Sequence, residues 1–360
     1  MKIPIPAYDL WEYLQRTEKV IVLYGMGNGA DKILSVCEAR GIVVSDFFAS
    51  DGFVRGQVFH GKTVLSYSAV KEKYGTENLI VLLSFATSRP EVLSSVHAVA
   101  DECELYAPDV PAFGETLFDR AFYLANEERF QAAYSLLADE ESRRIFEQVI
   151  LYKLTGKLCH LKAAENDKET VYRELLEADT IRTAMDLGAY NGDTIRELMA
   201  YAPALSRVYA MEPDRRSFRK LTEFASTLDG RPTVTAVQAA AWLENTTLCF
   251  GDEGNRNSSL SATGHATKTT EVTAMTADSL LAGACVDYIK YDVEGAEHEA
   301  LMGTAETIAV CRPRLLVSCY HRSEDLFALP LQLHDMRPDY RLYLRRYPYI
   351  PAWDLNLICV

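Results

Sequence analysis

The sequence predicts an α/β protein in two parts, each with a parallel sheet covered by helices. Two short apolar runs, one near residue 22 and one near residue 186, each lead into a glycine-containing turn and then into a helical pattern. The length of 360 residues is sufficient for two hydrophobic cores. We expect an N-terminal domain over residues 1–108, a helical connector packed on the second domain over 109–178, and a larger α/β domain over 179–360.

Composition and charge exclude several classes of protein. Charged residues make up 24% of the chain and hydrophobic residues 48%, as in globular proteins. The net charge of -14 and the pI near 5.1 argue against nucleic acid as a partner. No apolar run reaches about 18 residues and the N-terminus has no apolar signal core, so we expect no membrane span. The eight cysteines form no C-x-x-C pair, so we expect reduced thiols and a cytoplasmic protein.

The N-terminal domain begins with a buried strand over residues 20–24, and further strands are expected near 42–48 and 78–84. Gly25, Gly27 and Ala30 then follow the spacing of a dinucleotide-binding turn. Asp46 or Asp51 would be the ribose partner. A nucleotide or nucleotide-sugar site and an empty scaffold both fit this pattern.

The connector is helical in pattern. Apolar residues at positions 130, 133, 134 and 137 fall on one helical face, and residues 139–156 repeat the pattern before a terminating glycine. The segment is too apolar for a loose linker, so we expect its helices to pack on the second domain.

The second glycine turn lies at residues 186–193, D-L-G-A-Y-N-G-D, between an apolar strand and a helix. The next strand ends at Glu212, where a carboxylate can accept both hydroxyl groups of a ribose. A pyrophosphate would meet the carboxylates of Asp186 and Asp193, whereas the sulfonium and ammonium groups of S-adenosylmethionine would be attracted to them. The turn therefore favours S-adenosylmethionine over a dinucleotide.

The remaining elements follow in regular order. We expect a helix over 217–228, strands over 234–241, 246–250, 271–276, 286–292 and 314–321, and a helix over 297–310. The polar loop 251–259 is either an active-site flap or plain surface. Because ligands of doubly wound sheets gather at the carboxyl ends of the strands, Asp186, Glu212, Asp292 and His321 should meet at one edge.

These motifs carry a family resemblance. D-L-G-A-Y-N-G-D at 186–193, M-E-P at 211–213, I-K-Y-D-V-E-G-A-E at 289–297 and S-C-Y-H at 318–321 resemble the FkbM-type methyltransferases over about residues 140 to 360. The resemblance implies a class I methyltransferase (Rossmann-like) fold, with a seven-stranded mostly parallel sheet and an antiparallel last hairpin. It also implies oxygen methylation with S-adenosylmethionine, on sugars, glycans or polyketide-type products. The tail lacks the threonine-glutamate pair often seen entering the last strand. The first hundred residues resemble the Rossmann-like module of PglD-type sugar acyltransferases.

The expected site residues fall into three groups. We expect the cofactor to contact the turn, the ribose acid and the end of the third strand, namely Asp186, Gly188, Ala189, Tyr190, Gly192, Asp193, Glu212, Gln238 and Ala239. His321 or Asp292 is the expected proton acceptor. We expect the acceptor side to include Lys290, Glu294, Tyr320 and Arg345. Glu297 could join Asp292, Glu294 and His321 around a divalent metal, but no spacing demands one, and we assign no metal.

Two classes of function fit these residues. The first is a methyltransferase for a hydroxyl of a saccharide, glycan or glycosylated product, whose N-terminal domain helps to hold a nucleotide-linked or polymeric acceptor. The alternative is a non-catalytic protein that senses nucleotides with two Rossmann-like domains, or a methyltransferase for a small molecule that is not a sugar. A homo-oligomer is compatible with either.

Overall fold

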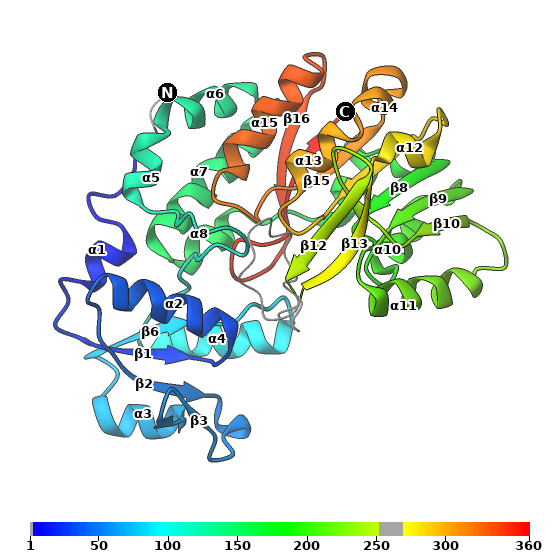
Figure 1. Ribbon diagram of the computed structural model, residues 1–360. Helices are drawn as coiled ribbons and strands as arrows, with labels where there is room; N and C mark the ends of the chain where they lie inside the picture. Colours follow the sequence, from blue (N-terminus) through cyan, green and yellow to red (C-terminus); the bar gives the residue numbers. More distant parts are fainter. Residues whose placement is uncertain (1–2, 252–268) are drawn as a thin grey trace.

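The structure, a computed structural model, describes residues 3–251 and 269–360 (Figure 1). Two parallel sheets lie on either side of a helical segment. The blue and cyan N-terminal sheet lies below it in Figure 1, and the second sheet, green to red, lies to its right. No helix among the described residues is long and apolar enough to cross a membrane.

The first sheet has the order β5-β2-β1-β6-β7, and all its strands are parallel. Strand β6, which lies between β1 and β7, is buried at every position, which explains the continuous apolar run that predicted it. Its elements are α1 (Leu10–Leu14), β1 (Val20–Tyr24), α2 (Asn28–Ala39), β2 (Val44–Ala49), η1 (Asp51–Phe53), β3 (Val58–Phe59), β4 (Lys62–Thr63), β5 (Leu65–Ser66), α3 (Tyr67–Tyr74), β6 (Leu79–Leu83), α4 (Pro90–Glu102) and β7 (Glu104–Tyr106).

Short helices join the two sheets. The longest of them, α7, starts where the Asp139 side chain accepts a hydrogen bond from the Ser142 amide and ends at Gly156, which has a φ of 66°. It packs against β16, and α6 packs against α15. The elements are α5 (Arg120–Ala125), α6 (Glu127–Leu136), α7 (Glu140–Thr155), α8 (Leu158–Ala163), α9 (Lys168–Thr170), η2 (Val171–Leu175) and η3 (Ala178–Thr180).

The second sheet confirms the predicted seven-stranded class I methyltransferase architecture. Its order is β10-β9-β8-β14-β15-β17-β16, and within it only β17 runs antiparallel to its neighbours. Its strands are β8 (Thr183–Leu187), β9 (Arg207–Met211), β10 (Thr233–Val237), β14 (Tyr288–Tyr291), β15 (Arg314–Ser318), β16 (Leu342–Arg346) and β17 (Leu355–Cys359). Its helices are α10 (Asp193–Tyr201), α11 (Arg215–Ser226), α12 (Ala277–Leu281), α13 (Glu297–Met302), α14 (Ala305–Cys311) and α15 (Asp325–Met336).

Two predicted elements are corrected. The strand expected over 234–241 ends with β10, and β11 (Ala240–Ala241) joins β12 (Thr246–Gly251) and β13 (Thr269–Met275) in a separate three-stranded sheet. The helix expected over 297–310 is two helices, because Gly303 lies against another chain segment. A Cβ atom on Gly303 would lie 2.0 Å from the carbonyl oxygen of Trp242. Beyond Gly251, the loop expected over 251–259 lies outside the described residues.

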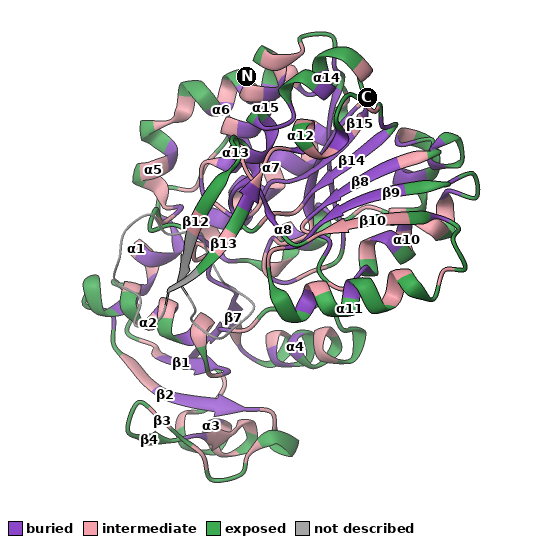
Figure 2. Cartoon of the chain, turned by 45° about the vertical axis from the view of Figure 1, so that its right-hand side comes forward, coloured by how far each residue is buried: buried purple, intermediate pink, exposed green. Residues whose placement is uncertain are grey.

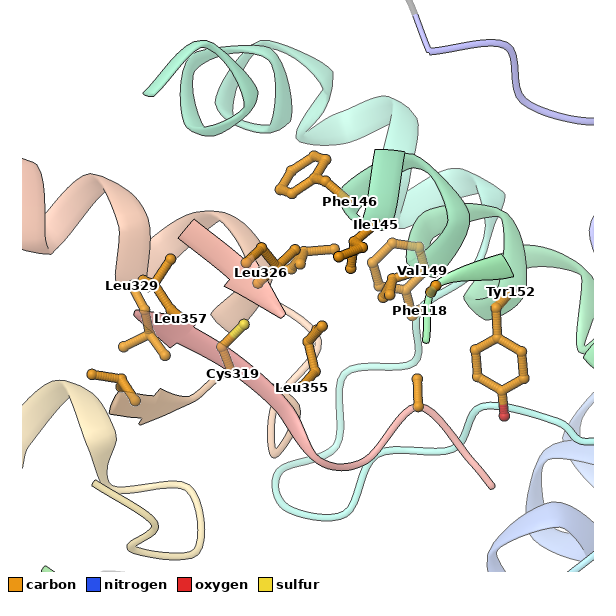
Figure 3. Close-up of a cluster of buried hydrophobic side chains, with 14 of the residues drawn as sticks. Phe118, Ile145, Phe146, Val149, Tyr152, Cys319, Leu326, Leu329, Leu355 and Leu357 are labelled. Carbon is orange, nitrogen blue, oxygen red and sulfur yellow. The ribbon is translucent and has the colours of Figure 1, made fainter. Parts of the chain in front are cut away.

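One buried cluster extends through all parts of the chain, and two further clusters lie beside it, one in each α/β part. Strands of both sheets are buried over most of their length (Figure 2). Figure 3 shows side chains of the connecting helices, including Phe146 and Val149, interlocking with Leu326 and Leu355 of the second sheet and its helices. The same cluster reaches Val22 in the first sheet. Each large apolar side chain buried in this way contributes about 1.5–3 kcal/mol, so the shared cluster holds the two sheets together.

The carboxyl edges of the two sheets meet directly. After β6 the chain turns at Thr87, which exchanges two backbone hydrogen bonds with Ile350 in the hairpin between β16 and β17. This hairpin lies beside the end of β15, because the Cys319 amide donates to the carbonyl oxygen of Leu355.

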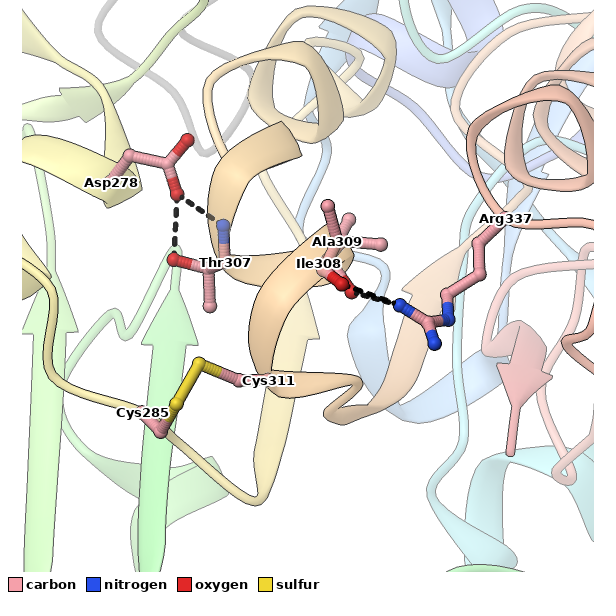
Figure 4. The surroundings of a disulfide bond; sticks show 7 residues. All are labelled: Asp278, Cys285, Thr307, Ile308, Ala309, Cys311 and Arg337. Carbon is pink, nitrogen blue, oxygen red and sulfur yellow. Dashed lines mark hydrogen bonds between the residues drawn. A yellow bond between two sulfur atoms is a disulfide. The ribbon is translucent and has the colours of Figure 1, made fainter.

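The cysteines require a correction. Cys285 and Cys311 form a disulfide bond, which joins the chain ahead of β14 to the end of α14 (Figure 4). The pairing escaped prediction because the two residues are 26 positions apart and are brought together only by the folded sheet. Five of the described cysteines are free thiols, namely Cys37, Cys103, Cys159, Cys319 and Cys359, and all of them except Cys159 are buried.

Candidate functional site

The turn after β8 is built on glycine. Gly188 and Gly192 have φ values of 84° and 82°, in the left-handed region that glycine adopts without strain. A Cβ atom on Gly188 would lie 2.0 Å from the carbonyl oxygen of Asp292, and one on Gly192 would lie 2.3 Å from the ring of Phe224. Only glycine therefore lets the turn touch the end of β14.

Glu212 lies beside this turn. Its two carboxylate oxygens each accept one backbone hydrogen bond, from Tyr190 and from Asp214, both at 2.8 Å. The residue is 6% exposed, and burial raises the pKa of its carboxyl group to about 7. The carboxylate is held in one orientation at the position where a ribose partner was predicted, and each oxygen retains a free lone pair.

The other predicted cofactor residues lie around or below the turn. Asp186 is buried beneath it. One of its carboxylate oxygens accepts a hydrogen bond from the hydroxyl group of Thr194, and the other has no hydrogen-bond partner among the described residues. A cavity of about 10 Å³ borders Asp186, Thr194 and Lys290 and has room for one water molecule. Asp193 is the first residue of α10. At the end of β10, Gln238 is exposed, whereas the neighbouring Ala239 in the predicted list is fully buried.

The ends of β14 and β15 bring an acidic cluster around His321. Its Nδ1 atom lies 2.8 Å from Oε1 of Glu297, the first residue of α13. Its Nε2 atom lies 3.6 Å from Oδ1 of Asp292 and 3.7 Å from Oε2 of Glu294. The histidine is 2% exposed and Glu297 is 1% exposed, whereas Glu294 is half-exposed. Both candidate bases therefore lie in one cluster, as the sequence predicts for two strand ends.

The charges of the cluster give the two candidate bases, His321 and Asp292, very different pKa values. Burial alone would lower the pKa of His321, but the carboxylates of Glu297, Asp292 and Glu294 raise it to about 9. Burial would raise the pKa of Asp292, but Lys290, whose Nζ lies 2.9 Å away, and His321 lower it to about 2. Asp292 thus remains a carboxylate, and His321 is much the stronger acceptor of a proton.

Glu297 fixes the orientation of the imidazole. The same oxygen that meets Nδ1 of His321 also accepts the backbone amide of Val293 at 3.0 Å, so the carboxylate is held from two sides. A proton on Nδ1 is thereby favoured, and Nε2 is left facing Asp292 and Glu294. The sequence offered Glu297 only as a metal ligand. An acid at the first position of a helix, directly after a strand-end turn, was the available signal.

Asp292, Glu297 and His321 each place one possible metal-ligand atom within 4.8 Å of the others. The existing contacts compete with an ion, however. Lys290 already neutralises Asp292, and Oε1 of Glu297 is occupied by Nδ1 and by the Val293 amide. Oε2 of Glu297 is buried and has no hydrogen-bond partner among the described residues. The contacts of Asp292 and of Oε1 favour a proton-transfer site over a metal site.

Aromatic side chains lead away from the cluster. The hydroxyl group of Tyr320 donates to Oδ1 of Asp292 at 3.1 Å. Its ring centroid lies 6.3 Å from that of Trp353, which in turn lies 5.6 Å from that of Tyr349. All three rings are partly exposed. They form a row from the hairpin to the candidate base.

Arg345, which was predicted on the acceptor side, has no contact with the acidic cluster among the contacts of the described residues. It is buried on β16 and donates to the carboxylate of Asp139, at 2.6 Å, and to the hydroxyl of Ser142, at 2.8 Å. These contacts attach α7 to the sheet, so we leave Arg345 out of the proposed acceptor site.

Packing explains two glycines of the N-terminal turn, Gly25 and Gly29, whereas a Cβ atom on Gly27 would meet no described atom within 4 Å. Cβ atoms on Gly25 and Gly29 would lie within 3 Å of atoms of the chain after β6, the nearest being 2.6 Å from Phe85 and 2.2 Å from the carbonyl oxygen of Ser84. Of the two predicted ribose partners, Asp46 is bound by Lys73 at 2.8 Å, and Asp51 by Ser68 at 2.6 Å. These contacts favour the empty scaffold over a nucleotide site.

Comparison with known families agrees with the second sheet and its motifs. Residues 186–351 match the Methyltransferase FkbM domain. The matched segment starts at the turn and includes the acidic cluster around His321 and, of the aromatic row, Tyr320 and Tyr349 but not Trp353. This part of the chain is therefore similar to the methyltransferase domains of the FkbM type. No curated protein matches the chain.

A solved structure of high similarity shares the fold, and two others match with low scores. The methyltransferase FkbM of Methylobacillus flagellatus KT is 21% identical, with a TM-score of 0.74 over 99% of this chain and 94% of that one. A putative rRNA methylase from Clostridium thermocellum is 9% identical, with a TM-score of 0.35 over 54% of this chain and 96% of that one. The precorrin-6y C5,15-methyltransferase of Geobacter metallireducens GS-15 is 13% identical, with a TM-score of 0.33 over 54% and 91%. The first similarity extends the shared fold beyond the FkbM domain to both sheets. The resemblance of the N-terminal part to PglD-type acyltransferases is not confirmed.

Proposed function

We propose that the protein is an S-adenosylmethionine-dependent O-methyltransferase for a hydroxyl group of a saccharide, glycan or glycosylated product. The observation that carries this proposal is the contact between the two halves of the site. Gly188 of the turn lies against the backbone of Asp292, where a Cβ atom would be 2.0 Å from the carbonyl oxygen. A methyl donor on the turn and a hydroxyl beside the acidic cluster would therefore lie next to each other, as direct transfer requires.

The residues fit the cofactor. Glu212 is fixed by two backbone amides and has lone pairs left for ribose hydroxyls, and the glycines keep the turn open to a ligand. Asp186 and Asp193 suit a ligand with a sulfonium and an ammonium group. When bound, the cofactor supplies an electrophilic methyl group on sulfur.

His321 is the proposed proton acceptor. Its Nε2 takes the hydroxyl proton during attack, while Glu297 holds Nδ1 and stabilises the imidazolium that forms. A positioned base of this kind contributes about 10²–10⁴-fold to the rate. Asp292, held ionised by Lys290, orients the acceptor and adds to the stabilisation of the imidazolium.

The acceptor class rests on the aromatic row. Faces of Tyr320, Trp353 and Tyr349 suit the apolar face of a sugar ring, and the carboxylate of Asp292 at the end of the row can accept a sugar hydroxyl. A polyol with one ring on these faces would bring a hydroxyl group to His321.

Mass spectrometry of the purified protein tests the cofactor first, because a tight site retains S-adenosylmethionine or S-adenosylhomocysteine. Titration calorimetry with both compounds then gives the affinity. Binding that is weakened in Glu212→Ala supports the proposal. A protein that binds neither compound, while nucleotides raise its melting temperature, would support the sensing protein instead.

A further inference from the structure

Residues 111–116, called here the strap, lie across the loop that carries His321. The amide of Phe113 donates to the carbonyl oxygen of His321 at 3.1 Å, and the two rings meet edge to face with centroids 5.4 Å apart. Further along, the hydroxyl of Ser323 donates to the carbonyl oxygen of Thr116 at 2.6 Å. The strap is therefore bonded to the histidine loop at two points and packed on the imidazole between them.

Gly295 makes room for this contact. A Cβ atom there would lie 3.0 Å from the Cβ of Phe113, and Gly295 has a φ of 90°, which other residues rarely adopt. The Arg322 guanidinium donates to the carbonyl oxygen of Gly295 at 2.7 Å and closes the same surface. Phe113 is only 5% exposed as a result.

The first sheet holds the strap from the other side. Nζ of Lys32, on α2, lies 2.8 Å from the carbonyl oxygen of Pro111 and 2.7 Å from that of Ala112. Hydrogen bonds from a charged donor are roughly twice as strong as neutral ones. The helix that follows the first glycine turn is thus linked by one side chain to the residues that cover the imidazole.

Phe113 supplies the uncharged side of the surroundings of His321. Charged or titratable groups face the imidazole from several elements: Asp292 and Glu294 after β14 with Lys290 behind them, Glu297 on α13 and Asp325 on α15. The chain neighbours Tyr320, whose ring centroid lies 4.2 Å from that of His321, and Arg322 also lie beside it. Water admitted at Phe113 would screen the attraction between these carboxylates and the imidazole. The strap therefore affects how strongly the carboxylates of the acidic cluster attract the protonated imidazole of His321.

We propose that the N-terminal domain serves catalysis by positioning the base: Lys32 holds the strap, and Phe113 of the strap holds and dehydrates His321. This inference rests on the proposed function, in which His321 takes the acceptor proton. It gives the first sheet a role that requires no ligand of its own.

The test follows the imidazole of His321 directly in the full-length protein. Histidine side chains are labelled with ¹⁵N, His321 is assigned by its loss in His321→Gln, and its pKa is measured by NMR with neither cofactor nor acceptor present. We expect a pKa near 9 in the wild type, and a fall of about one unit or more toward 6.5 in Lys32→Met and in Phe113→Ala. Phe113→Leu, which keeps an apolar cover, should shift it less and serves if the alanine variant fails to fold.

Lys62→Met is the matched control. Lys62 also donates to two backbone carbonyls of the first sheet, those of Val44 and Ser45, but it lies away from the strap. Its loss should leave the His321 titration unchanged. A His321 pKa that is the same in wild type, Lys32→Met and Phe113→Ala would overturn the inference, and Phe113→Leu takes the place of Phe113→Ala if the alanine variant fails to fold. Failure of the proposed function is a separate result, namely no binding of S-adenosylmethionine in calorimetry.

Discussion

The hydrogen bond between His321 and Glu297 restricts the orientation of both side chains at the centre of the acidic cluster. The carboxylate fixes one nitrogen of the ring and, with Asp292 and Glu294, makes the other an unusually strong proton acceptor. A base with a pKa near 9 gains driving force for a poorly acidic sugar hydroxyl. It must also lose its own proton before each turnover, which sets the pH dependence.

We predict that His321→Gln lowers the turnover number by about 10²–10⁴-fold and leaves the affinity for S-adenosylmethionine near that of the wild type. In the wild type the rate should rise with pH up to about 9, because the base is active only when unprotonated. The pH–rate profile of the variant should lack this limb. Asp292→Asn checks the assignment: if it is the more damaging change and His321→Gln is nearly silent, Asp292 is the base.

Glu212 gives a prediction that needs no acceptor. Glu212→Ala should weaken S-adenosylmethionine binding by about 10- to 100-fold, since hydrogen bonds to a charged group contribute about 1.5–3 kcal/mol. The raised pKa of about 7 adds a pH effect: below pH 7 the carboxyl group becomes protonated, so the wild-type affinity should fall. Calorimetry at several pH values measures both effects. An equal affinity in wild type and variant removes Glu212 from the ribose site.

At the scale of elements, the turn after β8 and the end of β14 act as one unit. Gly188 permits both the left-handed backbone and the close approach to Asp292. Gly188→Ala should therefore reduce S-adenosylmethionine binding by about 100-fold or more, since it adds about 1–2 kcal/mol of backbone strain and also displaces the neighbouring strand end.

Gly283→Ala, measured in the same calorimetric experiment, separates the effect of backbone strain from the effect of the close approach to Asp292. Gly283 has a nearly identical φ of 85°, but no atom of the described residues lies within 4 Å of the position of its Cβ atom. The Gly283→Ala variant should lower the free energy of unfolding through backbone strain alone and leave the affinity for S-adenosylmethionine unchanged. If both variants bind as the wild type does, the close approach has no role in the site.

The elements also show what the sequence could and could not predict. Apolar runs and glycine turns predicted β8, β9, β14 and β15 within a few residues, because their burial on both faces leaves a local signal. The break at Gly303 and the end of β10 depend on contacts with distant segments. The pairing of Arg345 with Asp139 and the contact of Phe113 with His321 join residues about 200 positions apart, and no local pattern reports such partners.

At the scale of the whole molecule, the first sheet, the connecting helices and the second sheet share one apolar cluster. The first sheet cannot unfold without exposing the cluster to water. The predicted domain limits therefore describe segments of the chain that depend on one another for their stability.

We predict a single cooperative thermal transition in scanning calorimetry, and S-adenosylmethionine should shift the whole transition upward by mass action. Two resolved transitions, of which only one responds to the cofactor, would show that the sheets unfold separately. The Lys32→Met variant should keep one transition, because the shared cluster does not depend on that side chain.

The backbone pairing of Thr87 with Ile350 has a consequence for protein engineering. It fixes the hairpin over residues 347–354 through main-chain atoms, at 2.8 and 2.9 Å, whatever side chains the hairpin carries. Tyr349 and Trp353 can therefore be exchanged while the loop keeps its course. A library of substitutions at these two positions is the route to a changed acceptor range that leaves the donor turn and the base in place.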